Sequence, residues 1–342
     1  MKRVIIVCLM LLSMSIGCIR PPAQPEPQPP VPLEVLEETL RWARENIETL
    51  EQLPLPDTAL KDLQRAKNNL RLAESSFAKA LYDEAYLSSL ESLAISQKLV
   101  RQFYKESIVS SARAAKERIE AITVEDPDSP LQEFLPDLTE ILDYSEGIEA
   151  SGQEIDLDKV LADFERVTEL SLHAQNTVQR TLESDISFES GAYRLSDRGK
   201  QAIAEYCREI LRVQQHVADV YPDRAVVIRI NLIGYTDQVG FKEGTNLLQL
   251  LTAGIDPQAI PQAKVELRKF LNRRLSEFRV ATLGDFLEQC LLAAQSGIRV
   301  ELHGSGRGEE LPPGGAPSEQ LSDPRRRICK IYTYVLLQSE EK

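Results

Sequence analysis

The sequence is poor in histidine, in closely spaced cysteines and in long hydrophobic runs. Its three histidines lie far apart, and none of its five cysteines stands in a CxxC spacing, so the sequence gives no support for a zinc site. The apolar stretch near the N-terminus, residues 4–16, has about thirteen residues, whereas a membrane-spanning helix needs about 20. No Gly-x-x-x-x-Gly-Lys stands between a predicted strand and helix, which argues against a phosphate-binding loop.

Basic charge is scarce as well. The chain carries 40 Lys and Arg against 53 Asp and Glu, a formal net charge of −13. Nucleic acids and anionic lipids attract basic surfaces, so this acidic chain is a poor candidate for binding either through basic patches. The sequence also offers no Ser/His/Asp, Cys/His or metal constellation, and we expect neither catalysis nor a cofactor.

The N-terminus has the layout of a secretory signal peptide, with a basic pair, the apolar stretch of residues 4–16, and Gly17 before Cys18. A small residue before such a cysteine resembles the lipobox of bacterial lipoproteins, in which the cysteine becomes the new N-terminus and carries acyl chains. The resemblance predicts removal of residues 1–17 and lipidation of Cys18. Ser15 stands where that family usually has leucine, so plain secretion with a free thiol is the alternative.

Lipidation would give the acidic chain a membrane anchor, because several acyl chains on one residue hold a protein stably at a bilayer. Ile19 is not the acidic residue that retains many lipoproteins at the inner membrane. The resemblance therefore predicts the periplasmic face of the outer membrane.

The rest of the chain divides into a linker and two domains. Residues 18–32 are rich in proline and predict an extended spacer. Residues 33–184 have almost no glycine and place apolar residues at three- and four-residue steps, which predicts an all-α bundle. Residues 185–342 bring glycines and β-branched runs, which predict strands alternating with helices. The expected fold class is α+β overall.

The bundle is predicted to hold helices near residues 34–52, 57–80, 83–122, 129–147 and 156–183. The turn at residues 77–85 resembles that of tetratricopeptide-like hairpins, but it lacks their glycine and no repeat of about 34 residues follows. A plain antiparallel bundle with Trp42 in its core and a peptide-binding groove are both open.

The C-terminal pattern predicts the order β-α-β-α-β-β, with helices packed on one face of a small mixed sheet. Ser196 can cap the first helix through its hydroxyl. The second strand is apolar almost throughout, which predicts burial on both faces. The expected strands are 186–188, 225–233, 299–303 and 328–336, and the expected helices are 195–217 and 264–294.

This region also holds a series of motifs in a fixed order. Phe188 and Leu-Ser-Asp-Arg-Gly at 195–199 come first, and Gly-Tyr-Thr-Asp-Gln-Val-Gly follows at 234–240. Then come Asn-Arg-Arg-Leu-Ser-Glu-Phe-Arg-Val-Ala at 272–281, Gly-Arg-Gly-Glu-Glu-Leu-Pro at 306–312 and Arg-Arg-Arg-Ile at 325–328. Together the motifs resemble the OmpA-like peptidoglycan-binding domain.

The resemblance implies a pair of ligand-gripping residues. Peptidoglycan stem peptides in many bacteria carry diaminopimelate, whose free end offers an ammonium and a carboxylate. Asp237, on a turn after a buried strand, would bind the ammonium, and Arg279, on the next long helix, would bind the carboxylate with two parallel N–H bonds. The other expected pocket residues are Thr236, Asn272, Ser276 and Arg326.

The sequence departs from the family at three places. The family passes from the Thr-Asp motif to the helix Asn in a handful of residues, whereas here an insertion, residues 241–271, intervenes. A lid over the pocket, a narrower ligand class and a docking surface for the bundle are open as its role. Tyr235 replaces the usual His, and Arg325 replaces the usual Asn.

These expectations combine into a non-catalytic tether that links a membrane, through its N-terminal lipid, to peptidoglycan, through its C-terminal domain. The alternative is an envelope adaptor whose helical region binds a partner protein, with the OmpA-like domain serving only localisation. For the cysteines, a Cys207–Cys290 disulfide, a Cys290–Cys329 disulfide and free buried thiols are all open.

Overall fold

A computed structural model describes residues 31–189, 192–294, 299–315 and 320–338 of the chain. Internal contacts divide the chain into two compact units, residues 1–99 and 100–342. The predicted signal peptide and Cys18 lie outside the described residues. Within the described ranges, no helix combines the length and the apolar character needed to cross a membrane.

The first unit is helical, as the sequence predicts. It contains α1 (Leu33–Glu51), α2 (Asp57–Ala78) and most of α3 (Tyr82–Phe103). Its core residues recur at three- and four-residue steps along these helices, for example Leu36, Leu40, Ala43 and Ile47 on α1 and Leu63, Ala66, Leu70 and Ala73 on α2. Contact between α3 and α2 is made at small residues. The buried Ser92 hydroxyl of α3 donates a hydrogen bond to the Ala66 carbonyl of α2 at 2.8 Å.

The turn between α2 and α3 lies where the sequence predicts it. The Leu81 amide donates to the Ser76 carbonyl and the Ala80 amide to the Phe77 carbonyl, both at 2.9 Å, which closes α2 with a Schellman motif. Ala80 has φ 59°, the left-handed conformation in which glycine is usual. Trp42 is 38% exposed, so the expectation that it anchors the bundle core is wrong.

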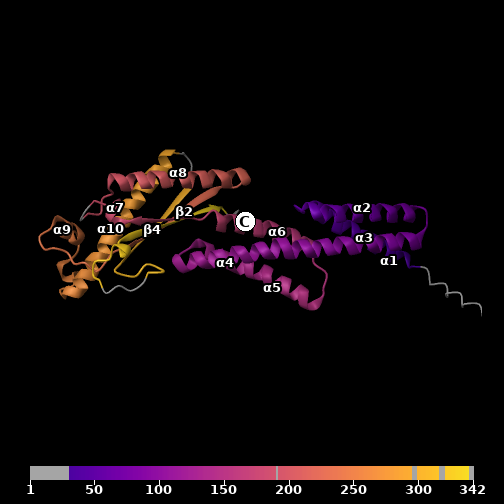
Figure 1. The fold of residues 1–342 in the computed structure, drawn as a ribbon, viewed down its shortest axis with the longest axis horizontal. Helices are drawn as coiled ribbons and strands as arrows, with labels where there is room; N and C mark the ends of the chain where they lie inside the picture. Colours follow the sequence, from indigo (N-terminus) through magenta and orange to yellow (C-terminus); the bar gives the residue numbers. More distant parts are fainter. Residues whose placement is uncertain (1–30, 190–191, 295–298, 316–319, 339–342) are drawn as a thin grey trace, which may run out of the picture. The chain divides into compact units, whose positions relative to one another are not determined.

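The second unit begins with helices and continues into the sheet (Figure 1). The helix predicted over 83–122 is interrupted, because a π-helical turn, Tyr104–Val109, separates α3 from α4. Ser129 and Asp156 cap the elements that follow them by accepting backbone N–H bonds. The helical elements here are α4 (Ser110–Glu125), a 3₁₀ turn (Pro130–Phe134), α5 (Leu135–Ser151) and α6 (Leu157–Gln175).

The first strand of the sheet differs from its prediction. The sequence pattern predicts helix to residue 183 and a strand at 186–188, but α6 ends at Gln175, β1 spans Val178–Glu183 and a short helix, α7, spans Ser184–Ser187. Side chains along β1 alternate between partly buried and exposed, and all six residues pair with β4. Pairing with a neighbouring strand overrides the helical preference of this segment.

The remaining elements confirm the predicted order and the α+β class. They are α8 (Asp197–Val220), β2 (Val226–Tyr235), α9 (Asn246–Thr252), a 3₁₀ turn (Pro257–Ala259), α10 (Lys264–Ala294), β3 (Arg299–Gly308), a 3₁₀ turn (Pro324–Arg326) and β4 (Ile328–Leu337). The sheet has the order β1-β4-β2-β3, in which β2 and β3 are parallel and the other neighbours are antiparallel. The sheet is therefore mixed, as predicted.

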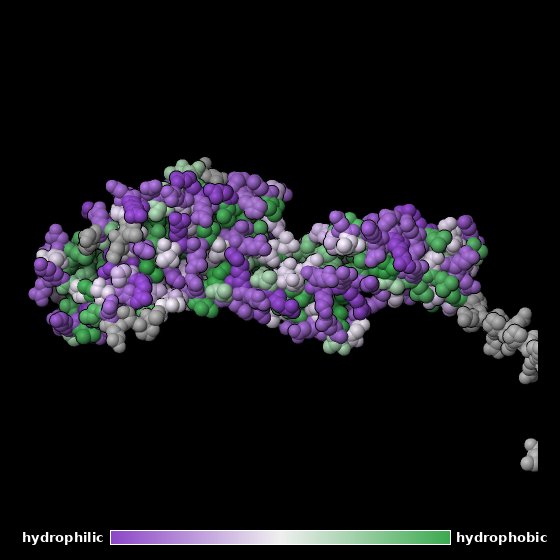
Figure 2. All heavy atoms as spheres, viewed as in Figure 1, coloured by the Kyte–Doolittle hydropathy of each residue, from purple (hydrophilic) through white to green (hydrophobic). Residues whose placement is uncertain are grey.

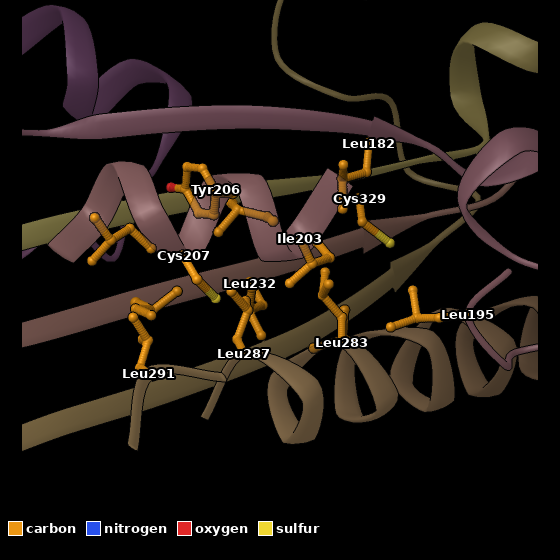
Figure 3. Packing of buried hydrophobic residues seen from close by; sticks show 14 of the residues in the cluster. Leu182, Leu195, Ile203, Tyr206, Cys207, Leu232, Leu283, Leu287, Leu291 and Cys329 are labelled. Atoms are coloured by element: carbon orange, nitrogen blue, oxygen red, sulfur yellow. The ribbon is translucent and has the colours of Figure 1, made fainter. Parts of the chain in front are cut away.

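One face of the sheet packs against α8 and α10. Ile228, Ile230 and Leu232 of β2 meet Ile203 of α8 and Leu283 of α10 in a core of fully or almost fully buried side chains (Figure 3). Burial of the apolar face of the sheet drives its packing against the two helices. The molecular surface visible in Figure 2 is mostly hydrophilic, with hydrophobic residues scattered over it.

The opposite face of the sheet is polar and meets the C-terminal end of α4. The fully buried Asp126 carboxylate accepts hydrogen bonds from Asn231 Nδ2 at 2.7 Å and from the Tyr334 hydroxyl at 2.5 Å. Glu125 accepts hydrogen bonds from Lys330 and Tyr332. The helices after residue 100 therefore belong to the same compact unit as the sheet, whereas the predicted domains divide the chain at 184/185.

The three cysteines within the described residues are free thiols. Cys207 and Cys290 lie in the core between α8 and α10, and Cys329 lies beside Leu182, well apart from Cys207 (Figure 3). Burial and the neighbouring Cys290 raise the pKa of the Cys207 thiol. A buried, protonated thiol behaves as a small hydrophobic group.

Candidate functional site

The candidate site lies where the parallel strands β2 and β3 end. The Thr236 amide, directly after β2, donates to the carbonyl of Gly308 at the end of β3, at 2.7 Å. Asp237 follows and is 5% exposed. Because the two strands are parallel, their C-terminal ends meet at one edge of the sheet, and this edge fixes the backbone that presents Asp237.

The partners of the Asp237 carboxylate include a backbone amide and an arginine. Its Oδ1 accepts a hydrogen bond from the Val239 amide at 3.2 Å, and its Oδ2 accepts one from Arg327 Nη1 at 3.0 Å. These hydrogen bonds fix the orientation of the carboxylate.

Arg279 comes from the middle of α10 and is 7% exposed. Its Nη2 donates to the Ala192 carbonyl at 3.4 Å, and its guanidinium carbon lies 5.2 Å from the centre of the Phe188 ring. An aromatic face next to a guanidinium favours it electrostatically and fixes its plane. Arg279 is therefore a buried, oriented cation.

A cysteine lies close to this cation. Burial raises the pKa of the Cys329 thiol to about 11, while the charge of Arg279 and a hydrogen bond with Ser184 act in the opposite direction. Cys329 is therefore a neutral thiol at physiological pH and adds no charge to the site.

α10 approaches the sheet edge closely because glycines face it. A Cβ atom on Gly234 would lie 2.8 Å from the Ser276 carbonyl oxygen, and one on Gly306 would lie 2.5 Å from the Glu277 amide nitrogen. Distances this short exclude any larger residue at either position. The two glycines thus set how near Arg279 comes to Asp237.

Some of the predicted site residues lie together around a cavity of about 530 Å³. Four of the predicted site residues line it, namely Thr236, Asp237, Asn272 and Arg279. Ser276 and Arg326 are not among its lining residues, whereas Arg327, which sequence reasoning passed over, is.

The two predicted residues outside the cavity have structural partners. The fully buried Ser276 hydroxyl donates to the Arg273 carbonyl at 2.7 Å and accepts from the Gly308 amide at 3.0 Å, which joins α10 to β3. Arg326 donates to the Glu309 carbonyl. The Arg-Arg-Arg-Ile motif contains Arg327, but a sequence alone does not show which of several adjacent arginines lines a cavity.

Asn272 has a structural partner as well as a place in the cavity wall. Its Nδ2 donates to the Glu309 carboxylate at 2.8 Å and lies 3.3 Å from the Val239 carbonyl oxygen. Thr236 is different, because its hydroxyl is buried and has no hydrogen-bond partner among the described residues. A buried hydroxyl without a partner is costly, and a ligand in the cavity can satisfy it.

The predicted insertion forms one wall of the cavity. The α9 helix contacts α10 (Figure 1). Leu251 of α9 is fully buried against Leu271 and Leu275 of α10, and Phe241 and Leu247 add to this apolar cluster. Phe241, Lys242, Thr245 and Leu247 also line the cavity. Of the roles open for the insertion, a narrower ligand class is the one that its place in the cavity wall favours.

Comparisons with known proteins add little to this geometry. The sequence matches no protein-family model, and it matches no curated protein. Among solved structures, the chain is similar to a MotB-like protein from Desulfovibrio vulgaris, with 14% identity, a TM-score of 0.29, and coverage of 48% of this chain and 76% of that one.

Proposed function

We propose that this protein is a non-catalytic tether that binds the stem peptide of peptidoglycan through its C-terminal domain. The observation that carries the proposal is the cavity in which a buried carboxylate, Asp237, and a buried guanidinium, Arg279, meet. The motif resemblance to OmpA-like domains supports the same ligand.

The charges of the cavity complement the free end of diaminopimelate. This end carries an ammonium and a carboxylate on one carbon, so a binding site needs an anion and a cation side by side. Asp237 accepts the ammonium, Arg279 donates to the carboxylate, and the Thr236 hydroxyl gains a partner. Each charge-assisted contact contributes roughly 1.5–3 kcal/mol.

We also propose that acyl chains on Cys18 hold the protein at the periplasmic face of the outer membrane. The arrangement of residues 1–18 supports this. Cys18→Ala should abolish incorporation of labelled fatty acid and release the protein from membrane fractions. Retention in the membrane together with continued labelling would contradict it.

Sedimentation with purified sacculi tests wall binding. The chain without residues 1–18 should sediment with sacculi, and Asp237→Asn or Arg279→Ala should raise the dissociation constant at least tenfold, since loss of about 1.4 kcal/mol corresponds to that factor. Arg279→Lys should also bind weakly, because an ammonium cannot form the two parallel bonds of a guanidinium.

Exposed residues of α8 provide matched controls. Asp219→Asn and Arg212→Lys change the same chemical groups on the surface, away from the cavity, and should bind like the unchanged chain. Equal sedimentation of all variants, with their folds verified by circular dichroism, would contradict the proposed binding of peptidoglycan by this cavity. That result would favour the adaptor, for which the exposed Leu72 and Leu87 of the first unit offer an apolar surface.

A further inference from the structure

We propose that the insertion adds a second anion contact, Lys242, so that the site prefers stem peptides with an additional free carboxylate over amidated ones. This inference rests on the proposed function, because it concerns the same cavity. It assigns a role to residues that lie outside the motifs shared with OmpA-like domains.

The backbone at Lys242 is held in place. The Thr245 hydroxyl donates to the Lys242 carbonyl at 3.0 Å and accepts from the Leu248 amide at 3.4 Å, so it joins the turn to the start of α9. Gly244, with φ 73°, allows this turn. α9 itself is anchored through the fully buried Leu251. The insertion therefore presents Lys242 at the cavity from a fixed support.

Among the described residues that line the cavity, cations outnumber acids by one. The cavity is lined by the cations Lys242, Arg279 and Arg327 and by the acids Asp237 and Glu189. Arg327 already pairs with Asp237, and a zwitterionic ligand end adds no net charge. Among the described residues, Lys242 has no carboxylate within ion-pair distance, Glu189 included. A ligand with a further carboxylate would balance this excess.

Stem peptides offer that group in two places. The glutamate residue and the C-terminus of a tripeptide stem each carry a carboxylate apart from the diaminopimelate side-chain end, and conversion to an amide removes its charge. Lys242 is exposed, so the contact is screened by water, and we expect a preference of about three- to fivefold.

Calorimetric titration of the full chain in mild detergent tests this inference. The probes are a diaminopimelate tripeptide with free carboxylates, the same peptide amidated at glutamate, and the same peptide amidated at its C-terminal carboxyl. One of the amidated peptides should bind three- to fivefold more weakly, and this identifies the carboxylate that Lys242 contacts. Lys242→Gln should remove the difference between the two peptides, and Lys242→Arg should preserve it.

Two further variants sharpen the result. Lys269→Gln alters an exposed lysine of α10 that pairs with Glu266 and does not line the cavity, so it should keep the preference. Glu189→Gln removes a negative charge that repels the ligand carboxylates, so it should strengthen binding of the peptide with free carboxylates. A preference that survives in Lys242→Gln, or equal affinity of the unchanged chain for all three peptides, would overturn the inference while the proposed function stands. Failure of the unchanged chain to bind any of them would overturn both.

Discussion

Two clusters of charged residues lie at the same edge of the sheet and differ in their surroundings. In one cluster, the Glu309 carboxylate accepts hydrogen bonds from Arg268 at 2.8 and 2.9 Å and from Asn272 at 2.8 Å, so its charge is satisfied within the protein. In the other, Asp237 and Arg279 line a cavity of about 530 Å³. We call the first cluster closed and the second, which lines the cavity, open.

The difference shows how motif residues divide between structure and binding. Asn272, Ser276 and Arg326 belong to the same series of motifs as Asp237 and Arg279, but they form hydrogen bonds with Glu309, Arg273 and Gly308. A polar group whose partners lie within the chain mainly stabilises the fold. We therefore expect changes in the closed cluster to lower stability and changes in the open cluster to lower binding.

The largest effect is expected at Glu309. Glu309→Ala leaves Arg268 and Asn272 without their shared acceptor, and the free energy of unfolding should fall by about 3 kcal/mol. Urea denaturation of the chain without residues 1–18 measures this. Glu310→Ala is the matched control, since the side chain of Glu310 is 61% exposed and its ion pair with Arg307 is long, 3.9 Å. A loss of stability no greater than that of Glu310→Ala would contradict the structural role of the closed cluster.

A second closed cluster should respond to pH. Hydrogen bonds from His173 and Arg224 lower the pKa of Glu169 from 4.5 to about 2, although burial acts in the opposite direction. A carboxyl group with a lowered pKa in the folded state contributes stability that is present above pH 4.5 and is lost as the pH falls towards 2. The full pKa shift corresponds to about 3 kcal/mol, but water screens the partly exposed pair of Glu169 with Arg224, so the contribution should be about 2 kcal/mol.

Glu169→Gln tests this contribution. The variant should be less stable than the unchanged chain at neutral pH, and the difference should shrink between pH 4.5 and pH 2. Urea denaturation across this range provides the measurement. A difference that stays constant with pH would contradict the closed character of this cluster.

The smallest effect on stability is expected in the open cluster. Asp237→Asn keeps the shape of the side chain and loses the charge that pairs with Arg327, whose side chain is 24% exposed. The free energy of unfolding should fall by about 1 kcal/mol or less, although wall binding is lost. A loss as large as that of Glu309→Ala would place Asp237 among the structural residues.

Sequence patterns predicted α10 and β2 well. The bounds of α10, Lys264–Ala294, match the prediction, and its buried residues recur at short steps of one to four residues from Leu271 to Leu291. β2 is buried on both faces, as its continuous apolar run indicates. These features depend on local patterns that a sequence displays directly.

Other features depend on partners far away in the sequence. β1 is a strand because β4 pairs with it, some 150 residues later, and its own residues also suit a helix. The contact of Glu125 and Asp126 with the sheet joins helices to strands across about 200 residues. The choice between Arg326 and Arg327 depends on the local course of the chain before β4. None of these has a local signal.

Binding of two short peptides tests the central claim most directly. One is a stem tripeptide ending in diaminopimelate, and the other carries lysine at that position, which retains the ammonium and lacks the side-chain carboxylate. If Asp237 and Arg279 together hold the zwitterionic end, titration should give an affinity at least tenfold higher for the first peptide, and Arg279→Ala should erase the difference. Equal affinity for the two peptides would contradict the account.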